Sequence, residues 1–545
     1  MRKALIILTF LSANFTSKSI IAQCAPPIAT TTLDINNVSV GLMTGGDFWW
    51  DGIGVPRYEY PKGSGRDALF AGAIWLSALD ANGSLLTSAM KYRSSGYEFY
   101  AGPINSTTGT VTNASCSIFD RFWKIHRSEV QIHLNNVTLG IPVPLSQIDD
   151  AILNWPAKGN VHFTSYSIQD DLAPFKDFNN NGIYDPENGD YPDIKGDQAI
   201  FWVINDIGGI HAISNGDPLG VEVQFLAYAY YDPSSSMNDA TFYDIKVIKK
   251  TPGNASDFYM GLFVDPDLGN PQDDFVGCDT LTNTGYAYNG DSFDDDHSGR
   301  PGYGQNSPII STTFLNKKMN SFSLSSYAPN ATGDPVLPVH YRNYLKGFWR
   351  DGSVKTIGGT GFGGTIPTSF MYFSNPVSPS PAWSEVSVGN SPGDRRYIQS
   401  TGPYSLNYME PFDISFVTIA HNVMGSSDVS VLVLPTISQI SQLYTDSLAS
   451  GNKYDFALGI NPIAESSINI YPNPVTNILS IDLTGLTVGN IRITDLNGRE
   501  VYQDKGNPNS QVLKVDMSIF ENGFYLLSLE INGEKRFYKI LNSHH

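Results

Sequence analysis

The chain has 545 residues, of which 41% are hydrophobic and 12% aromatic, and this excludes a largely disordered protein. A net charge of -19 disfavours nucleic acid and anionic lipid as partners. Beyond residue 23, no run reaches the ~20 apolar residues of a membrane-spanning helix, so no transmembrane segment is expected in the mature chain.

The first 23 residues have the pattern of a secretory signal peptide. Arg2 and Lys3 form a basic start, residues 4–15 are mostly apolar, and Gln23 offers a cleavage position. We therefore expect Sec export into the periplasm and a mature chain that begins at Cys24. A lipoprotein is the alternative, because a cysteine would lead the mature chain, although Gln23 is unusual before a lipidated cysteine.

Three cysteines, Cys24, Cys116 and Cys278, allow one disulfide bond at most and leave one thiol over. Cys116 and Cys278 lie inside segments that we expect to be structured. Cys24 lies at the expected mature terminus, where chain ends commonly fray. If a bridge forms, we expect it to join Cys116 with Cys278.

Short alternating runs and frequent Gly and Pro predict mainly β structure for the body of the chain. In chain order, the patterns predict strands at residues 70–79, 121–125, 199–204, 221–231, 242–249 and 429–434, with a short helix at 146–154. We divide the body into an N-terminal β domain (24–165), an Asp- and Asn-rich β region with calcium loops (166–306) and a β domain (307–435). The last two can be continuous, and β-sandwich-type domains are expected.

Residues 436–450 have the clearest helical pattern, because Ile437, Ile440 and Tyr444 fall on one face. With the polar stretch that follows, residues 436–467 are expected to form a helix and a linker. Residues 468–545 then contain β-runs at 478–481, 491–493 and 524–529 between Asn-Gly turns. This spacing predicts a small C-terminal β-sandwich.

The C-terminal block resembles the type A C-terminal sorting domain of the type IX secretion system of Bacteroidetes. The resemblance covers about 75 residues, and its matching segments are Tyr471-Pro472-Asn473-Pro474, Asp495-Leu496-Asn497-Gly498-Arg499-Glu500-Val501, Asn522-Gly523-Phe524-Tyr525-Leu526 and Lys535-Arg536-Phe537-Tyr538-Lys539-Ile540. The resemblance implies that the translocon and a sortase recognise residues 468–545. It also implies a final location outside the cell or on the outer surface, whether anchored or released.

The body resembles large secreted Bacteroidetes proteins that carry such sorting domains. Segments with this resemblance include residues 96–103, 120–125, 189–198, 265–269, 273–279 and 393–396. The resemblance implies location and architecture, and it implies no activity.

The sharpest candidate site is a loop that begins at Asp177. Oxygen-bearing side chains occupy its alternate positions, as in the first nine positions of an EF-hand-type loop, and Gly182 allows the sharp turn. The expected Ca²⁺ ligands are Asp177, Asn179, Asn181, the carbonyl of Ile183, and Asp185, with Glu187 or Asp190 completing the shell. The alternative is a turn without metal. Since every ligand would come from the protein, we expect a structural role.

Two further acidic clusters follow in the chain. The first contains Asp265, Asp267, Asp273, Asp274 and Asp279, for which we expect a cation, because crowded carboxylates repel one another. The second, at residues 291–296, is expected to be a solvated loop, with calcium as the alternative. An acid and base pair of a glycosidase is an alternative use of these aspartates.

We find no catalytic motif in a suitable context. The G-x-S-x-G pattern of a nucleophile elbow occurs at Gly389-Asn390-Ser391-Pro392-Gly393. However, Pro392 follows the serine, and the pattern is not preceded by a predicted strand or followed by a predicted helix. The favoured function is a calcium-stabilised structural, adhesive or binding protein, with glycans or other surface proteins as partners. A secreted hydrolase of polysaccharide or protein, and a non-catalytic carbohydrate-binding protein, are the alternatives. The sequence does not identify the ligand, the substrate or the oligomeric state.

Overall fold

The computed structural model describes residues 24–137, 141–325, 331–378, 382–445, 470–483, 488–495, 499–505, 512–531 and 534–543. By its internal contacts the chain divides into two units, residues 1–454 and residues 455–545. The prediction of a mainly β fold is confirmed in both units. In the described residues, no helix has the length and apolar character needed to cross a membrane.

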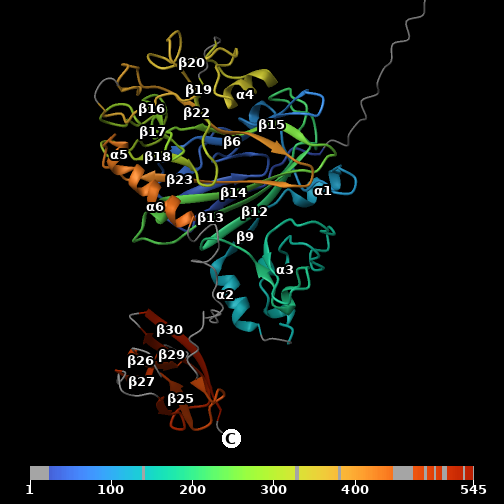
Figure 1. Cartoon of the computed structure of the whole chain (residues 1–545), viewed down its shortest axis with the longest axis vertical. Coiled ribbons are helices and arrows are strands. Elements are labelled where there is room, and N and C mark those ends of the chain that lie inside the picture. Colours follow the sequence, from blue (N-terminus) through green and yellow to red (C-terminus); the bar gives the residue numbers. More distant parts are fainter. Residues whose placement is uncertain are drawn as a thin grey trace, which may run out of the picture. The chain divides into compact units, whose positions relative to one another are not determined.

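The body contains two large antiparallel sheets (Figure 1). The first has the order β19 (Ser321–Ser325), β22 (Arg396–Leu406), β15 (Ala255–Asp265), β6 (Ala71–Leu79), β3 (Asp47–Phe48), β2 (Ser39–Met43), β4 (Tyr58–Glu59) and β5 (Asp67–Leu69), with β1 (Thr30–Leu33) on β2 and β7 (Leu85–Ala89) on β6. The second has the order β16 (Asp274–Asp279), β17 (Thr284–Asn289), β18 (Ile309–Phe314), β23 (Pro411–His421), β14 (Ala240–Lys249), β13 (Val221–Ala229), β12 (Gln198–Asn205) and β8 (Tyr100–Ala101), with β9 (Trp123–His126) on β12.

Smaller elements decorate the sheets. The helices are α1 (Asn113–Phe119), α2 (Arg127–Asn136), α3 (Asp150–Leu153), α4 (Pro338–Leu345), α5 (Val429–Leu432) and α6 (Leu434–Leu443), with 3₁₀ turns η1 (Arg93–Ser95), η2 (Leu145–Gln147), η3 (Pro186–Asn188) and η4 (Ser236–Asp239). Two short ribbons pair β10 (Phe175–Lys176) with β11 (Tyr191–Pro192), and β20 (Lys355–Thr356) with β21 (Pro367–Thr368). Helix α4 contacts strands of the first sheet, whereas α2 and α3 contact β9 of the second sheet.

The two sheets share one core. Apolar residues of both sheets are buried in the same cluster, and rings from opposite sheets touch: Phe48 of β3 stacks with Tyr243 of β14 at a centroid distance of 6.0 Å. Next to this pair, the indole of Trp49 donates a hydrogen bond to the Tyr243 hydroxyl over 2.9 Å. The body is therefore a β-sandwich, stabilised mainly by the apolar area that the facing sheets remove from water.

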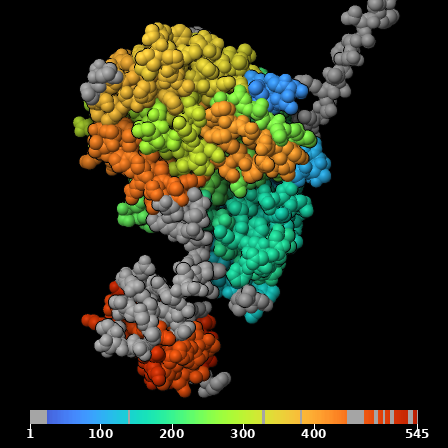
Figure 2. Space-filling view, in the orientation of Figure 1, coloured from blue at the N-terminus to red at the C-terminus, as the bar shows by residue number. Residues whose placement is uncertain are grey.

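Strand pairing crosses the expected boundaries at residues 165/166 and 306/307. Strand β15 lies between β6 and β22, and β14 pairs with β23, so strands from all three predicted regions share the two sheets. Figure 2 shows the same interleaving on one face of the body, where middle (green) and late (orange) residues adjoin.

The predicted disulfide bond was wrong. Cys24 is bonded to Cys116 of α1, with a Cα–Cα distance of 5.9 Å, and Cys278 is a buried free thiol in β16. The expected fraying of the terminus does not occur, because the backbone N–H groups of Ile28 and Ala29 donate hydrogen bonds to the Asp120 carboxylate. Held there, Cys24 lies beside α1.

The predicted strand at residues 429–434 was also wrong, because this segment forms α5 and the start of α6. Val429, Val433 and Ile437 are buried, whereas Val431 is 65% exposed. This four-residue spacing of buried positions is that of a helix rather than of a strand. The helix expected at 436–450 is present as α6, and the part of the prediction beyond residue 445 lies outside the described residues.

The C-terminal unit contains two small antiparallel sheets. One has the order β24 (Ile470–Tyr471), β25 (Ile478–Asp482) and β28 (Val512–Asp516), and the other has β27 (Glu500–Asp504), β26 (Val488–Asp495), β29 (Gly523–Ile531) and β30 (Glu534–Asn542). Leu479 of the first sheet and Ile493 and Leu527 of the second are buried in one cluster. The predicted β-runs are confirmed, whereas the turns at Asn497-Gly498 and Asn532-Gly533 lie outside the described residues.

Candidate functional site

The strongest candidate site lies where β15 ends and β22 begins. These strands are antiparallel neighbours with Val264 opposite Tyr397, so residues just after β15 and just before β22 meet at one edge of the first sheet. Asp265 is the last residue of β15, and Asp394 precedes β22 by two residues. The register of one strand pair therefore brings together aspartates that are far apart in the sequence.

These aspartates line a cavity of about 330 Å³ that we call the carboxylate pocket, defined by Trp50, Phe70, Tyr92, Asp265, Asp267, Asp394 and Arg396. Its three aromatic rings contact one another, with centroid distances of 5.6 Å for Trp50–Tyr92 and 6.1 Å for Phe70–Tyr92. Trp50 is buried, whereas Phe70 and Tyr92 are partly exposed. The pocket is thus lined by aromatic rings as well as by charged side chains.

Hydrogen bonds hold most of the charged side chains in place. The Tyr92 hydroxyl donates to Asp265 Oδ2 over 2.5 Å, and Arg396 Nε donates to the Tyr92 hydroxyl over 2.9 Å. Arg396 Nη2 donates to both oxygens of Asp394 at 2.9 Å. Asp267 is different, because its carboxylate forms no hydrogen bond or ion pair with any residue in the described ranges.

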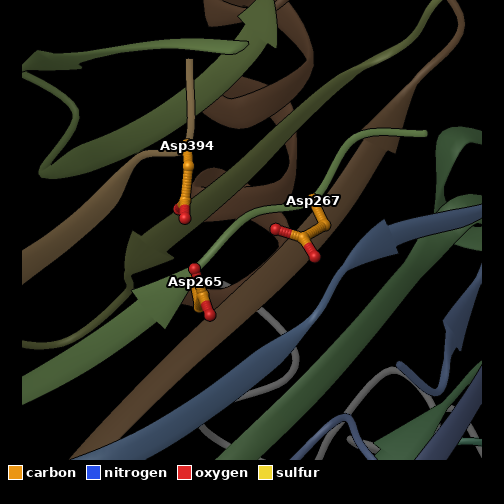
Figure 3. A group of neighbouring side chains, drawn as sticks. All are labelled: Asp265, Asp267 and Asp394. Atoms are coloured by element: carbon orange, nitrogen blue, oxygen red, sulfur yellow. The ribbon is translucent and has the colours of Figure 1, made fainter. Parts of the chain in front are cut away.

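One ligand oxygen from each of Asp265, Asp267 and Asp394 lies within 4.8 Å of the other two, and Figure 3 shows the three carboxylates around a common space. Burial raises the pKa of Asp265 to about 7, Arg396 opposes this rise, and Asp394 adds to it. Burial, followed by the charges of Asp265 and Asp394, raises the pKa of Asp267 well above its ordinary value. The raised pKa values show that ionising all three carboxylates would place more negative charge in the pocket than its single guanidinium balances.

Asp273 and Asp274, which the sequence grouped with Asp265 and Asp267, face a neighbouring group around Asn270. Asn270 Nδ2 donates to Asp273 Oδ2 over 2.9 Å, and the N–H of Leu268 donates to Asp274 Oδ2 over 3.1 Å. Asp294, from the cluster at 291–296, accepts hydrogen bonds here from the N–H groups of Asn270 and Tyr303. Burial raises the pKa of Asp273 to about 7 and that of Asp274 well above its ordinary value.

The loop from Asp177 closes on itself through its own side chains. Asp177 accepts hydrogen bonds from the N–H groups of Asn181 and Gly182, and Gly182 has the positive φ of 82° that position six requires. The amides of Asn179 and Asn181 both donate to Asp185, at 3.0 and 2.7 Å. Rotating these amides would present oxygens to the same space, because the two amide atoms differ little in shape.

Of the two candidates for the last ligand of this loop, Asp190 faces the loop and Glu187 contacts a histidine instead. Asp190 is buried and accepts hydrogen bonds from the N–H groups of Phe178 and Asp185, so it faces the loop. Burial raises its pKa to about 7, and the charges of Asp185 and Asp177 add to the rise. The Glu187 carboxylate instead lies 3.0 Å from Nε2 of His162.

The sequence interpretation missed Tyr92, Asp394 and Arg396 as members of a site. The segment 393–396 stood out only through its resemblance to other secreted proteins, and Tyr92 had no signal of its own. Trp49 and Trp50, which adjoin in the sequence, are both buried.

Comparisons with known proteins bear mainly on the C-terminal unit. Residues 469–542 match the family described as the secretion system C-terminal sorting domain. The ulvan lyase NLR42 of Nonlabens ulvanivorans is 29% identical over 91 residues, which are 16% of this chain and 17% of the lyase. The chain thus matches less than a fifth of that relative's length.

Among solved structures, the heparan sulfate lyase HepC from Pedobacter heparinus has a TM-score of 0.20 at 8% identity, and the alignment covers 97% of this chain and 43% of the lyase. A polysaccharide lyase aligns with a TM-score of 0.19 at 8% identity, covering 63% of this chain and 38% of its own. TM-scores this low do not establish a shared fold.

Proposed function

Since residues 469–542 are a secretion system C-terminal sorting domain, the chain is a secreted or outer-surface protein, and we propose that its body binds a neutral glycan in the carboxylate pocket. The observation that carries the proposal is the pocket itself, which is lined by three aromatic side chains together with three carboxylates and one guanidinium. Ligand sites combine apolar walls with a few convergent polar groups in this way.

The chemistry of the pocket suits a sugar ring. The partly exposed rings of Phe70 and Tyr92 offer flat surfaces for the C–H face of a sugar. Asp267 and Asp394 can accept hydrogen bonds from hydroxyl groups, while the Arg396 guanidinium donates. The surplus of carboxylates, together with the net charge of -19, favours a neutral glycan over an acidic one.

The test is an array of neutral and acidic glycans probed with the secreted protein, followed by calorimetry on the best neutral glycan. Phe70→Ala should weaken binding at least tenfold, because it removes an apolar wall of the pocket. The matched control is Phe362→Ala, since Phe362 is 52% exposed and lies outside the pocket. The proposal fails if no neutral glycan binds the folded protein, or if the two variants bind equally well.

Calcium in the loop from Asp177 belongs to the same proposal as a structural support. The loop gathers Asp177, Asp185 and Asp190 within fourteen residues, and without a cation their charges oppose folding. The alternation of oxygen-bearing residues and the inward-facing Asp190 support this ion. Its binding free energy would add to the stability of the folded body.

A secreted glycoside hydrolase is the second candidate, and one observation favours it. The pKa of about 7 for Asp265 suits a proton donor, and neighbouring carboxylates lie close enough to assist. An enzyme would release reducing sugars from the glycan found on the array. In that case Asp265→Asn should abolish turnover while binding persists, and the absence of any turnover leaves the pocket as a binding site alone.

A further inference from the structure

We infer that Asp265, Asp267 and Asp394 bind a calcium ion in the carboxylate pocket, separate from the loop at Asp177, and that the open positions of this ion hold ligand hydroxyl groups. Ca²⁺ takes six to eight oxygens at 2.3–2.6 Å, so two oxygens on one ion lie at most about 5 Å apart. One oxygen from each of the three aspartates lies within 4.8 Å of the other two. A common ion is therefore geometrically allowed.

The charges of the pocket also match a divalent ion. Arg396 is the one cationic side chain among the residues that line the pocket, and it faces three carboxylates. Arg396 bonds both oxygens of Asp394, but each carboxylate oxygen has a second lone pair that can still bind a metal ion. When all three carboxylates are ionised, as metal binding requires, three negative charges and one positive charge leave a surplus of two, which is the charge that one Ca²⁺ ion neutralises.

An independent observation points to a missing partner. The Asp265 side chain is 4% exposed, and its Oδ1 receives no hydrogen bond from the described part of the chain. This oxygen forms an ion pair with Arg396 Nε, at 3.4 Å, but that contact is no hydrogen bond. Buried polar atoms in proteins nearly always have partners, and for carboxylate oxygens without donors a cation is the natural one.

The surroundings leave part of the coordination sphere open. Three protein carboxylates supply at most six oxygens, and the cavity of about 330 Å³ adjoins them on the side of Phe70 and Tyr92. Water fills such positions until a ligand oxygen replaces it, and vicinal hydroxyl groups of a sugar can supply two at once. This last step rests on the proposed function, whereas the ion itself does not.

The experiment uses the full secreted protein, stripped of metal and titrated with CaCl₂ by calorimetry. Asp177→Ala serves as the parent, so that the loop does not contribute. In this parent, Asp267→Asn should weaken the remaining calcium binding at least tenfold. It should fold normally, because Asp267 forms no hydrogen bond that the amide would break. The matched control is Asp295→Asn, which removes an exposed carboxylate outside the pocket and should bind as the parent does.

A second readout is terbium luminescence excited through the aromatic rings, since Trp50 and Tyr92 line the pocket. Asp267→Asn should remove most of the sensitised signal of the parent. The inference is overturned if the parent binds no calcium, or if Asp267→Asn binds it as the parent does. The sugar step is tested by repeating glycan binding in chelator, which should reduce affinity at least tenfold. Loss of calcium binding in Asp267→Asn without any glycan binding would retain the ion and reject the proposed function.

Discussion

Lys355 of β20 has a fully buried side chain in a neutral environment. Its ammonium donates hydrogen bonds to Ser323 Oγ and to the Phe322 carbonyl, and it lies 5.8 Å from the centre of the Trp349 ring. Burial lowers its pKa from 10.5 to about 7. Between these values the unfolded chain binds a proton that the folded chain does not, so stability rises with pH from about 7 to 10.5.

We therefore predict that Lys355→Met removes this rise. One linked proton corresponds to a slope of at most about 1.4 kcal/mol per pH unit, and below pH 7 the group adds no further slope. The measurement is urea unfolding of wild type and variant between pH 6 and pH 10. Lys246→Met, which changes an exposed lysine, should keep the wild-type slope. If the free energy of unfolding changed with pH in the same way for wild type and for Lys355→Met, the prediction would be wrong.

The loop at Asp177 gives a second prediction at the level of single residues. With 2 mM Ca²⁺ and a dissociation constant of about 10⁻⁴ M, the ion would add ~2 kcal/mol of stability. A chelator should lower the melting temperature of wild type, and Asp177→Ala should lose most of that dependence. Asp351→Ala is the control, because Asp351 also closes its own turn, through Ser353. Equal chelator effects on Asp177→Ala and wild type would show that this loop binds no ion.

At the level of elements, the disulfide between Cys24 and Cys116 ties the first described residues to α1. It closes a loop with a sequence separation of 92, and removing such a cross-link costs about 2–5 kcal/mol. Cys24→Ser with Cys116→Ser should therefore lower the melting temperature. Adding reductant should lower that of wild type but leave that of the double variant unchanged. Peptide mapping without reductant checks the pairing, and a Cys116–Cys278 peptide would contradict the structure.

Local patterns predicted most elements of the body. The strands at 199–204, 221–231 and 242–249 were confirmed as β12, β13 and β14, because long apolar runs bounded by turns have few alternatives. The prediction of a strand at residues 429–434 was wrong because the β-branched residues of this segment favour a strand locally. Its buried positions, Val429 and Val433, are instead set by packing against the rest of the body, which a local pattern does not contain.

The candidate site was predicted only in part, for a related reason. Asp265 and Asp267 were nominated from their spacing, but Asp394 and Arg396 join them through the pairing of β15 with β22. The register of strands more than a hundred residues apart cannot be read from one sequence. Asp274 instead begins β16, which pairs with β17 in the second sheet, and it faces the group around Asn270.

At the scale of the whole molecule, the chain has two compact units, and residues 469–542 of the second are the sorting domain. We predict that a chain ending at Tyr454 keeps the melting temperature of the body but is not exported beyond the periplasm. Fractionation of cells that produce each form measures this. Export of the shortened chain to the surface would contradict the prediction.

We also predict processing at both ends during export. Mass spectrometry of the surface or culture protein should find a start at Cys24 and the loss of the block from about residue 467. In cells without the translocon, the full chain after Gln23 should accumulate in the periplasm. A mature surface form that retains residues 470–543 would contradict the cleavage, though not the export itself.

The late strands β22 and β23 lie inside the sheets rather than at their edges. Strand β22 separates β19 from β15, and β23 separates β18 from β14. The first sheet cannot be completed until residue 406 has left the ribosome or the inner-membrane channel, and the second cannot be completed until residue 421 has. Folding of the body is therefore expected to be slow and to follow synthesis rather than accompany it. Until then, the edges of β14 and β15 are unpaired and can associate with other chains. If the chain reaches the periplasm through Sec, as its first 23 residues predict, we expect residence there to be the interval in which aggregation threatens it most and chaperones help it most.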